Sequence, residues 1–282
     1  MNDYRPFPRT TLGGISVPRM IMGTNWLLGT SHTSNAADQQ IKARYPDHKS
    51  LFPVIEEYMK YGINMFYNGP PEAIKYAEDK LGKEIINLKL IMIDPADNAQ
   101  ARHESEEKIK QAARDGAKFV FLFHAQVEEL VDKHAKKIRR IGDYTKMIRD
   151  AGMIPGFSAH MPEIIIYSDE NDYDVEGYIQ IFNCMGFMMQ VEIEFVARII
   201  HNAKHPVIAI KPMAAGRVSP YVGLTFCYNA IREKDMVCVG AYDEMEVAED
   251  VEIARAALDR RFPDIPLRNS LLFAEQAVLG TK

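Results

Sequence analysis

Polar and ionisable side chains stand at the ends of several short apolar runs in this chain. His124 follows the run 119–123, and Lys211 follows the run 207–210. Further residues at or near such ends are Asn25, Tyr67, Asn68, Asp94 and His160. In a parallel α/β barrel the carboxyl ends of the strands converge on one mouth, where such side chains would face one another. This recurrence favours an enzyme with its site at that mouth.

Two of these residues, His124 and Lys211, could carry acid–base chemistry. A histidine has a reference pKa of ~6.5, so it can donate or accept a proton near neutral pH. Burial at a strand end would lower the pKa of a lysine, which could then act as a proton shuttle, an oxyanion stabiliser or a Schiff-base amine. The alternatives are a hydrogen-bonded structural histidine and a lysine that braces the mouth through an ion pair.

Asp94 and His160 have more than one interpretation. Asp94 could cap the turn that follows it, pair with Lys211, or hold His124 in one tautomer. His160 could act at the mouth or cap the helical segment that follows it. Asp94, His124 and His160 together could bind a divalent metal, although no HxH or HExxH spacing supports such a site. The metal site therefore stands as the alternative to metal-free acid–base chemistry.

The apolar runs recur at intervals of about thirty residues and alternate with amphipathic stretches, as βα units require. They predict strands near 20–24, 64–68, 88–93, 118–123, 153–158, 177–182, 206–211 and 236–240. Eight strands in series predict a closed (β/α)8 TIM barrel, and we expect one domain over residues 1–282. Before the first strand, Gly13 and Gly14 predict the turn of a short N-terminal β-hairpin.

Helices are expected between these strands. They are predicted at 50–61, 72–81, 104–115, 145–151, 190–203, 220–232 and 244–257. Glycines at 62, 82, 116 and 152 each lie just before the next strand, as is typical of the residue that follows a helix.

Three segments depart from this rhythm. Residues 25–49 form a long polar connection after the first strand, which could close the mouth as a lid or dock on a neighbouring subunit of a homo-oligomer. Residues 125–144 are highly charged and predict a solvated helix. The acidic run 168–174 predicts a surface loop, with a divalent-ion site as its alternative.

Composition restricts the partners. The net charge is −5, from 34 Lys and Arg against 39 Asp and Glu, so no basic face stands out that would bind nucleic acid. The three cysteines lack CxxC spacing, and we expect reduced thiols in a cytoplasmic protein. No apolar run approaches the ~18 residues of a membrane span, and the N-terminus lacks an apolar signal segment. We therefore expect a soluble protein that acts on a small molecule.

The order of these motifs resembles the aldo/keto reductase superfamily over nearly the whole chain. The segment 122–124 resembles that family's fourth-strand histidine, 156–160 its fifth-strand glycine–serine segment, and 211–217 its seventh strand. Further similar segments are 11–14, 22–26, 62–66, 178–183 and 239–240. The resemblance implies a barrel that reduces a carbonyl compound with NAD(P).

The catalytic residues of the family are mostly replaced. Its reductases use a tyrosine as general acid, assisted by a lysine–aspartate pair, and a histidine that orients the carbonyl. His124 matches this histidine, whereas Tyr67 stands at the aspartate position. The tyrosine position falls near Glu72 and the lysine position at or beside Asp94. The resemblance therefore implies a shared scaffold with altered chemistry, in which Tyr67 could replace the usual acid beside His124.

The cofactor contacts of the family are partly retained. Ser158 and Gln180 match positions that bind the nicotinamide amide, and glycine-bearing segments follow the seventh and eighth strands, where barrels often bind phosphate. The cofactor-binding candidates are Thr24, Ser158, Gln180, Gly216, Arg217 and Gly240. The segment 240–246 is acidic where NADP-binding members carry basic side chains, which favours NAD over NADP.

Three functions remain open. The first is a divergent NAD(P)-linked oxidoreductase acting on a small carbonyl or sugar-like substrate. The second is a lyase, isomerase or hydrolase that uses His124, Asp94 and Lys211, with or without a metal. The third is a catalytically silent barrel that binds a ligand or a partner, in which His124 and Lys211 would lie in packed surroundings with no cavity between them.

Overall fold

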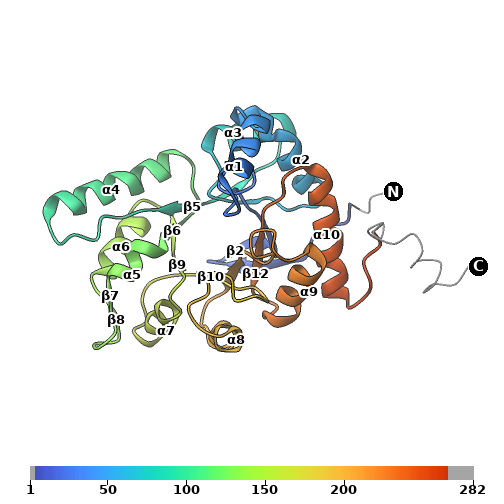
Figure 1. Cartoon of the computed structure of the whole chain (residues 1–282). Helices are drawn as coiled ribbons and strands as arrows, with labels where there is room; N and C mark the ends of the chain where they lie inside the picture. The colour runs from blue at the N-terminus through green and yellow to red at the C-terminus, as the bar shows by residue number, and fades with distance from the viewer. Residues whose placement is uncertain (1–3, 266–282) are drawn as a thin grey trace, which may run out of the picture.

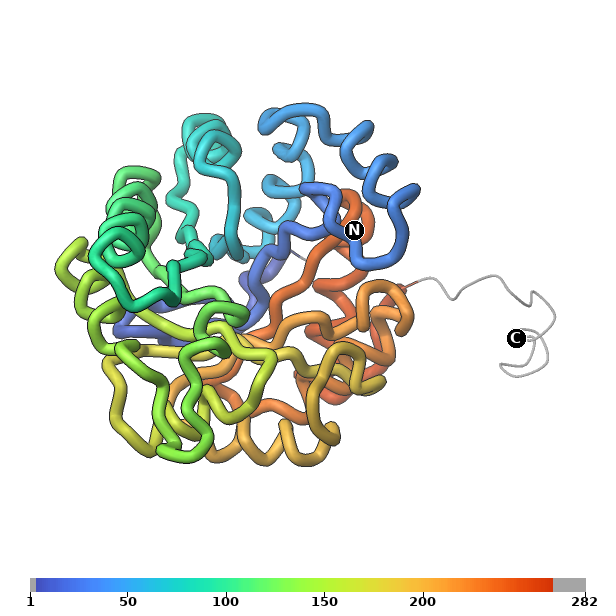
Figure 2. The backbone as a smooth tube through the Cα atoms, turned by 60° about the vertical axis from the view of Figure 1, so that its left-hand side comes forward, coloured from blue at the N-terminus to red at the C-terminus, as the bar shows by residue number. Residues whose placement is uncertain are grey.

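A closed barrel of eight parallel strands forms the centre of the molecule (Figure 2). The computed structural model describes residues 4–265, so residues 1–3 and 266–282 of the expected domain lie outside the described part. The strands are β3 (Met20–Met22), β4 (Met65–Tyr67), β5 (Ile86–Ile91), β6 (Phe119–Leu122), β9 (Ile154–Ala159), β10 (Tyr178–Ile181), β11 (Val207–Ile210) and β12 (Met236–Val239). The predicted (β/α)8 barrel is confirmed, and each predicted strand is present to within a few residues.

The barrel closes because its first and last strands pair. Cys238 of β12 lies opposite Ile21 of β3, and on the other side Ser158 of β9 lies opposite Ile179 of β10. All the barrel strands run in the same direction, so their carboxyl ends meet at one end of the molecule.

The predicted N-terminal hairpin is confirmed and closes the opposite end of the barrel. It consists of β1 (Arg9–Leu12) and β2 (Ile15–Pro18), joined by Gly13 and Gly14 with φ values of +52° and +77°. Leu12 and Val17 are fully buried among the side chains inside the barrel. The amino-terminal end of the barrel is therefore filled by this hairpin.

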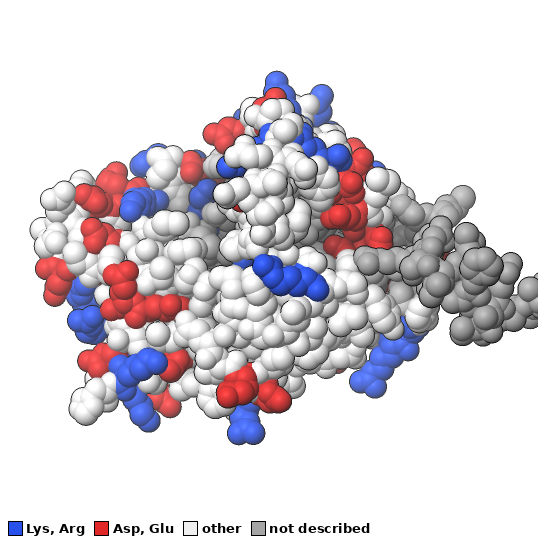
Figure 3. Space-filling view, viewed as in Figure 1, with Lys and Arg blue, Asp and Glu red and all other residues white. Residues whose placement is uncertain are grey.

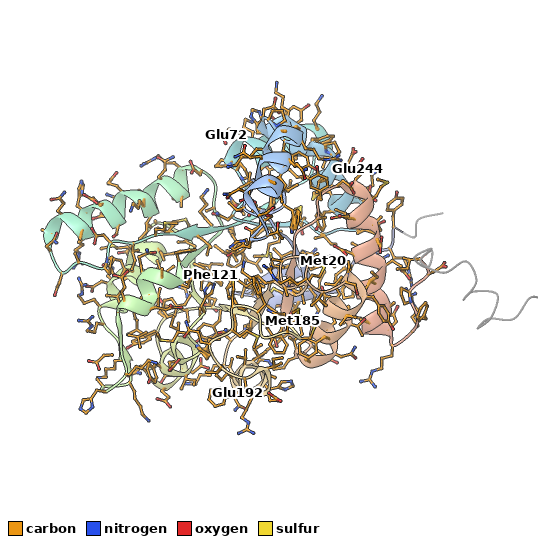
Figure 4. All side chains as sticks on the ribbon, viewed as in Figure 1. Met20, Glu72, Phe121, Met185, Glu192 and Glu244 are labelled. Atoms are coloured by element: carbon orange, nitrogen blue, oxygen red, sulfur yellow. The ribbon has the colours of Figure 1, made fainter. Side chains whose placement is uncertain are left out.

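The inside of the barrel is apolar up to the level of the mouth. Alternate residues of each strand face the same side, so one set fills the interior and the other packs against the helices. The interior set includes Ile21, Met65, Leu88, Phe119, Phe121, Ile179, Ile181, Ile208, Met236 and Cys238. Figure 4 shows Phe121 within the body of the molecule. The polar residues that follow these positions are carried to the rim of a solid core.

The predicted helices surround the barrel (Figure 1). They are α2 (Phe52–Lys60), α3 (Pro71–Leu81), α4 (Ala99–Arg114), α6 (Ile141–Asp150), α8 (Ile193–Asn202), α9 (Pro220–Ala230) and α10 (Glu244–Asp259). The four glycines expected after helices all have positive φ, which residues with a side chain rarely adopt. The last helix, α10, packs against both α9 and α2, so the last helices of the barrel contact the first one.

The long segment 25–49 is not structureless. It contains α1 (Asn35–Arg44), which begins where the Ser34 hydroxyl accepts a hydrogen bond from the backbone N–H of Ala37, and the short 3-10 helix η1 (His48–Leu51).

The prediction of one helix over 125–144 is wrong. The segment forms α5 (His124–Glu129), a small hairpin of β7 (Val131–Asp132) and β8 (Lys137–Ile138), and the start of α6. The Asp132 carboxylate accepts the backbone N–H groups of His134 and Ala135, which stabilises a turn instead of a helix. The acidic run 168–174 also begins inside a helix, α7 (Glu163–Glu170), and continues as a turn.

Charged side chains lie mainly around the edges of the face shown in Figure 3, and its centre is largely uncharged. All three cysteines are in the described part of the chain and are free. Among residues 4–265, no helix is long and apolar enough to cross a bilayer.

Candidate functional site

A cavity of about 490 Å³ lies at the carboxyl ends of the barrel strands. Five of the barrel strands contribute a side chain with chemistry at or just after their ends: Tyr67, His124, Ser158, Lys211 and Cys238. Further residues of the wall include Thr24, Trp26, His32, Asn68, His160, Met188, Gly216 and Gly240. Tyr67, His124, His160 and Lys211, all proposed from the sequence, are thus brought to one cavity, together with Thr24, Ser158, Gly216 and Gly240.

His124 and His160 lie face to face. Their ring centroids are 3.5 Å apart and the rings are inclined by 17°. Burial, with a smaller contribution from nearby Lys211, lowers the pKa of His124 to about 4. Burial and the neighbouring His124 lower the pKa of His160 to about 3. Both imidazoles are therefore neutral at pH 7, and they can donate and accept hydrogen bonds but carry no charge.

Lys211 follows β11 and projects a cation into this cavity. Burial lowers the pKa of its ammonium. Within residues 4–265, the Lys211 side chain makes no ion pair and no hydrogen bond, so the bracing ion pair considered for it does not form there. Lys211 also has a φ of +59°, a left-handed backbone conformation that residues with a side chain rarely adopt.

Left-handed backbone recurs around the cavity. Besides Lys211, the non-glycine residues with positive φ in its wall are His32, Asn68, Met188 and Ala215. Such conformations cost about 1–3 kcal/mol each and persist where the surrounding structure holds them, commonly at functional sites. The concentration of strained residues around the cavity indicates that this part of the barrel carries the functional site.

Two further groups in the wall stay protonated. Burial raises the pKa of the Tyr67 phenol far above its usual value, and it raises the pKa of the Cys238 thiol to about 12. Tyr67 can therefore donate a proton but is not a base at neutral pH. Glu72, at the family's tyrosine position, is exposed in the first turn of α3 and lies on the periphery in Figure 4.

Asp94 is not part of the cavity wall. Its carboxylate accepts the backbone N–H of Ala96 at 2.9 Å, and its own N–H donates to the Ser105 hydroxyl at 2.9 Å. Asp94 thus caps the turn after β5, the alternative that the sequence left open. The metal site of Asp94, His124 and His160 is not assembled, and among the described residues no three His, Cys, Asp or Glu side chains gather as a metal would require.

Gln180 and Arg217 also lie outside this wall. Ile179 and Ile181 face the inside of the barrel, so the alternation of the strand turns Gln180 toward the helices, where it is fully buried. The Arg217 guanidinium donates to the carbonyls of Ala214 and His32 and lies 4.2 Å from the ring of Phe187.

The segment 25–49 crosses the mouth and is held by the loops after β11 and β12. The His32 carbonyl accepts the guanidinium of Arg217, and the Tyr45 hydroxyl donates to the carbonyl of Tyr242. The Arg44 guanidinium lies 4.8 Å from the ring of Tyr242. His32 and Cys238 were not proposed as site residues. Only the fold reveals that His32 of this segment lies against the cavity and that β12 turns Cys238 inward.

A second cavity of about 420 Å³ adjoins the first and shares Trp26, Met213, Gly216 and Gly240 with it. Its outer part is lined by Arg217, Ser219, Glu246, Glu249 and Asp250. Asp250 is only 3% exposed, and its carboxylate has no hydrogen-bond partner within residues 4–265. Burial raises the pKa values of Asp250 and Glu246.

Known structures share this architecture. A protein from Pseudomonas aeruginosa described as an aldo-keto reductase superposes with a TM-score of 0.62 at 14% identity, covering 90% of this chain and 98% of that one. A second, from Klebsiella pneumoniae and solved with NADP and acetate, has a TM-score of 0.50 at 15% identity and covers 92% of each chain. These likenesses show that the chain shares its barrel fold with aldo-keto reductases. No family model matches the sequence, and no curated protein matches it significantly.

The same scaffold also occurs in enzymes with other chemistry. A truncated 3-deoxy-D-arabino-heptulosonate 7-phosphate synthase from Thermotoga maritima superposes with a TM-score of 0.53 at 10% identity, covering 90% of this chain and 93% of that one. At such low identities the likeness concerns the fold, so function must be argued from the site.

Proposed function

We propose that this protein is an NAD(P)-linked oxidoreductase that reduces a small carbonyl compound at the cavity lined by His124, Tyr67 and Lys211. The proposal rests on the two cavities that meet at the loops after β11 and β12. One cavity carries the reactive side chains and the other extends outward over the start of α10. A dinucleotide needs a site with this extended shape.

The junction of the cavities fits a cofactor backbone. Gly216 has a φ of +82°, and a Cβ added to Gly216 or Gly240 would point toward Trp26 at 3.7 and 3.5 Å, into the space where the cavities meet. Loops after the seventh and eighth strands of a barrel commonly bind phosphate through their N–H groups. Gly216, Gly240 and Trp26 would hold the middle of the dinucleotide, and Thr24 and Ser158 would face its nicotinamide end.

Bound nicotinamide would supply a hydride to the carbonyl carbon. On the protein side, the neutral imidazole of His124 can donate a hydrogen bond to the carbonyl oxygen and polarise it. Tyr67 keeps its proton because it is buried. The oxygen that gains charge becomes more basic than a phenolate, so Tyr67 can donate the proton that completes the alcohol.

Binding of the dinucleotide can be measured directly. Trp26 is the only tryptophan in the chain and lies in the wall shared by both cavities. We expect NADH to quench its fluorescence, and calorimetry on the same protein should give the same affinity. Failure of both NADH and NADPH to bind at about 1 mM would overturn the proposal.

Lys211 favours one other function. A half-buried amine with a lowered pKa and no ion pair in the described part of the chain can attack a carbonyl carbon, forming an imine and releasing water. A lyase or aldolase reaction could follow from that step. Reduction by borohydride of a mixture of protein and pyruvate would then attach the substrate carbon skeleton covalently to Lys211, as mass spectrometry would show. The silent-barrel hypothesis loses its support, because His124 and Lys211 share a cavity.

A further inference from the structure

The described wall of the cavity at the mouth carries basic side chains and no carboxylate. Among its described wall residues there is no aspartate or glutamate. The wall contains one lysine, Lys211, and three histidines, His32, His124 and His160. Tyr67 and Cys238 keep their protons, so the described wall groups that can carry a charge near neutral pH are all basic. The chain as a whole is acidic, with a net charge of −5.

Among residues 4–265, Lys211 has no counter-ion that would compete with an anionic ligand. The nearest groups that act on it electrostatically are the Cys238 thiol and the three histidines. Cys238 stays a neutral thiol because it is buried. A partly buried ammonium without an anion is costly, and proteins normally pair or neutralise such a charge. An incoming anion would supply the missing partner.

Arg217 does not share this role. Its guanidinium is taken up by the carbonyls of Ala214 and His32 and by the ring of Phe187, and it borders the second cavity instead of the first. Among the described residues, the wall of the first cavity thus contains a single positive charge, that of Lys211. This charge matches a carboxylate, whereas a phosphate monoester would bring about two negative charges into a half-buried site with only one cation.

We propose that the substrate of this cavity is a carboxylic acid whose carboxylate pairs with Lys211 while its carbonyl faces His124 and Tyr67. The substrate class is therefore a small 2-oxo or 3-oxo acid. The neutral imidazole of His160 adds a hydrogen-bond donor or acceptor beside the same group. The position of the carbonyl rests on the proposed function, whereas the carboxylate site rests on the cavity alone.

The test compares pyruvate with pyruvamide, its uncharged isostere, by calorimetry without a dinucleotide. We expect pyruvate to bind about ten- to hundredfold more tightly, because a charge-assisted hydrogen bond to Lys211 forms with only one of the two. In Lys211→Met this preference should disappear, and Lys211→Arg should retain part of it. Equal binding of the two probes, or a preference that survives in Lys211→Met, would overturn the proposal.

A matched control is Lys89→Met. Lys89 is another lysine of the barrel, but it lies within β5. Its neighbours Leu88 and Leu90 pack with the interior, so Lys89 faces outward. It should bind pyruvate as the wild type does. Melting curves of both variants show whether they fold, and Lys211→Met should fold because it removes an uncompensated charge.

Two further results test whether the ligand binds through a carboxylate and whether it pairs with Lys211 without a covalent bond. Stronger binding of inorganic phosphate than of pyruvate would replace the carboxylate with a phosphate and overturn this assignment. A borohydride-trapped adduct on Lys211 would show that the amine bonds covalently to the substrate instead of pairing with it. If pyruvate binds through Lys211 but no dinucleotide binds, the anion site stands and the oxidoreductase function fails.

Discussion

The rings of His124 and His160, which follow the neighbouring strands β6 and β9, stack with their centroids 3.5 Å apart. Lys211 is close enough to lower the pKa of both. Two imidazoles in this arrangement cannot both be protonated at modest cost, because each positive charge would face another in a half-buried cavity. Their neutrality makes the pair a hydrogen-bonding surface at physiological pH.

Acid should destabilise the protein through this pair. Because the pKa values of His124 and His160 in the folded state are about 4 and about 3, the unfolded chain binds more protons below its ordinary histidine pKa of ~6.5. Stability is thus present above ~6.5 and lost as the pH falls toward these values. The free energy of unfolding, measured with urea, should fall between pH 7 and pH 5 in both proteins. We expect the fall in His160→Phe to be smaller than in the wild type by about 1–2 kcal/mol. The control is His103→Phe, an exposed residue of α4, which should behave as the wild type.

Tyr67→Phe should slow turnover without weakening substrate binding. The phenol is the proton donor of the proposed reaction, and loss of a general acid commonly costs about 10²–10⁴ in rate. The measurement is kcat and KM for reduction of a 2-oxo acid with NADH. Tyr221→Phe, an exposed tyrosine of α9, serves as the control. An unchanged kcat in Tyr67→Phe would assign the proton to another group.

The acidic end of the second cavity should select NADH over NADPH. Glu246, Glu249 and Asp250 line this end, so a 2′-phosphate would meet carboxyl groups instead of the cations that bind it, whereas ribose hydroxyls can donate hydrogen bonds to them. We expect NADH to bind at least about tenfold more tightly. Glu249→Gln should narrow the difference between the two affinities by improving NADPH binding, whereas Glu194→Gln, in the first turn of α8, should leave it unchanged. Tighter binding of NADPH to the wild type would contradict this account of the cavity.

Gly156 should be intolerant of a methyl group. A Cβ at this position of β9 would lie 2.3 Å from the ring of Phe121, which fills the barrel interior. We expect Gly156→Ala to lower the free energy of unfolding by about 1–3 kcal/mol, as overpacking does. Gly142→Ala is the matched control, because a Cβ on this α6 glycine meets nothing within 4 Å and should be neutral or stabilising.

The segment 25–49 should loosen when its contact with Tyr242 is removed. Tyr45→Phe deletes the hydroxyl that donates to the Tyr242 carbonyl and leaves the ring in place. We expect faster amide hydrogen exchange confined to this segment and faster association of cavity ligands, as a lid would give. Tyr173→Phe loses a hydroxyl at the distant β7–β8 hairpin and controls for general loosening. Unchanged exchange over the segment would mean that other contacts hold it.

The barrel could be predicted because its strands are buried on both faces. Such strands are continuous apolar runs, and the polar residue that ends each run is conspicuous, as at His124 and Lys211. The same logic could not orient Gln180, because a shift of one position turns a strand residue from the interior to the helices. It also could not separate capping from catalysis at Asp94, which depends on where the chain turns.

Charge pattern was a poor guide to local structure between β6 and α6. Acidic and basic residues suit the solvated face of a helix and of a hairpin alike, and the side-chain hydrogen bonds of Asp132 decided the outcome. The sequence pointed to the segment 25–49 as a possible cover of the mouth, but it could not show which of its residues, such as His32, line the cavity. Their place in the cavity depends on contacts such as that between Arg217 and the His32 carbonyl.

The filled interior of the barrel, with the hairpin of β1 and β2 at its far end, leaves the cavity open at the mouth alone. With Leu12 and Val17 sealing the far end of the barrel, a molecule held beside His124 can depart only by the route through which it arrived. Two molecules bound in line would therefore exchange in a fixed sequence, the inner one waiting for the outer one to leave. Steady-state kinetics of such a protein should show compulsory order, imposed by the packing at an end of the barrel that neither molecule touches.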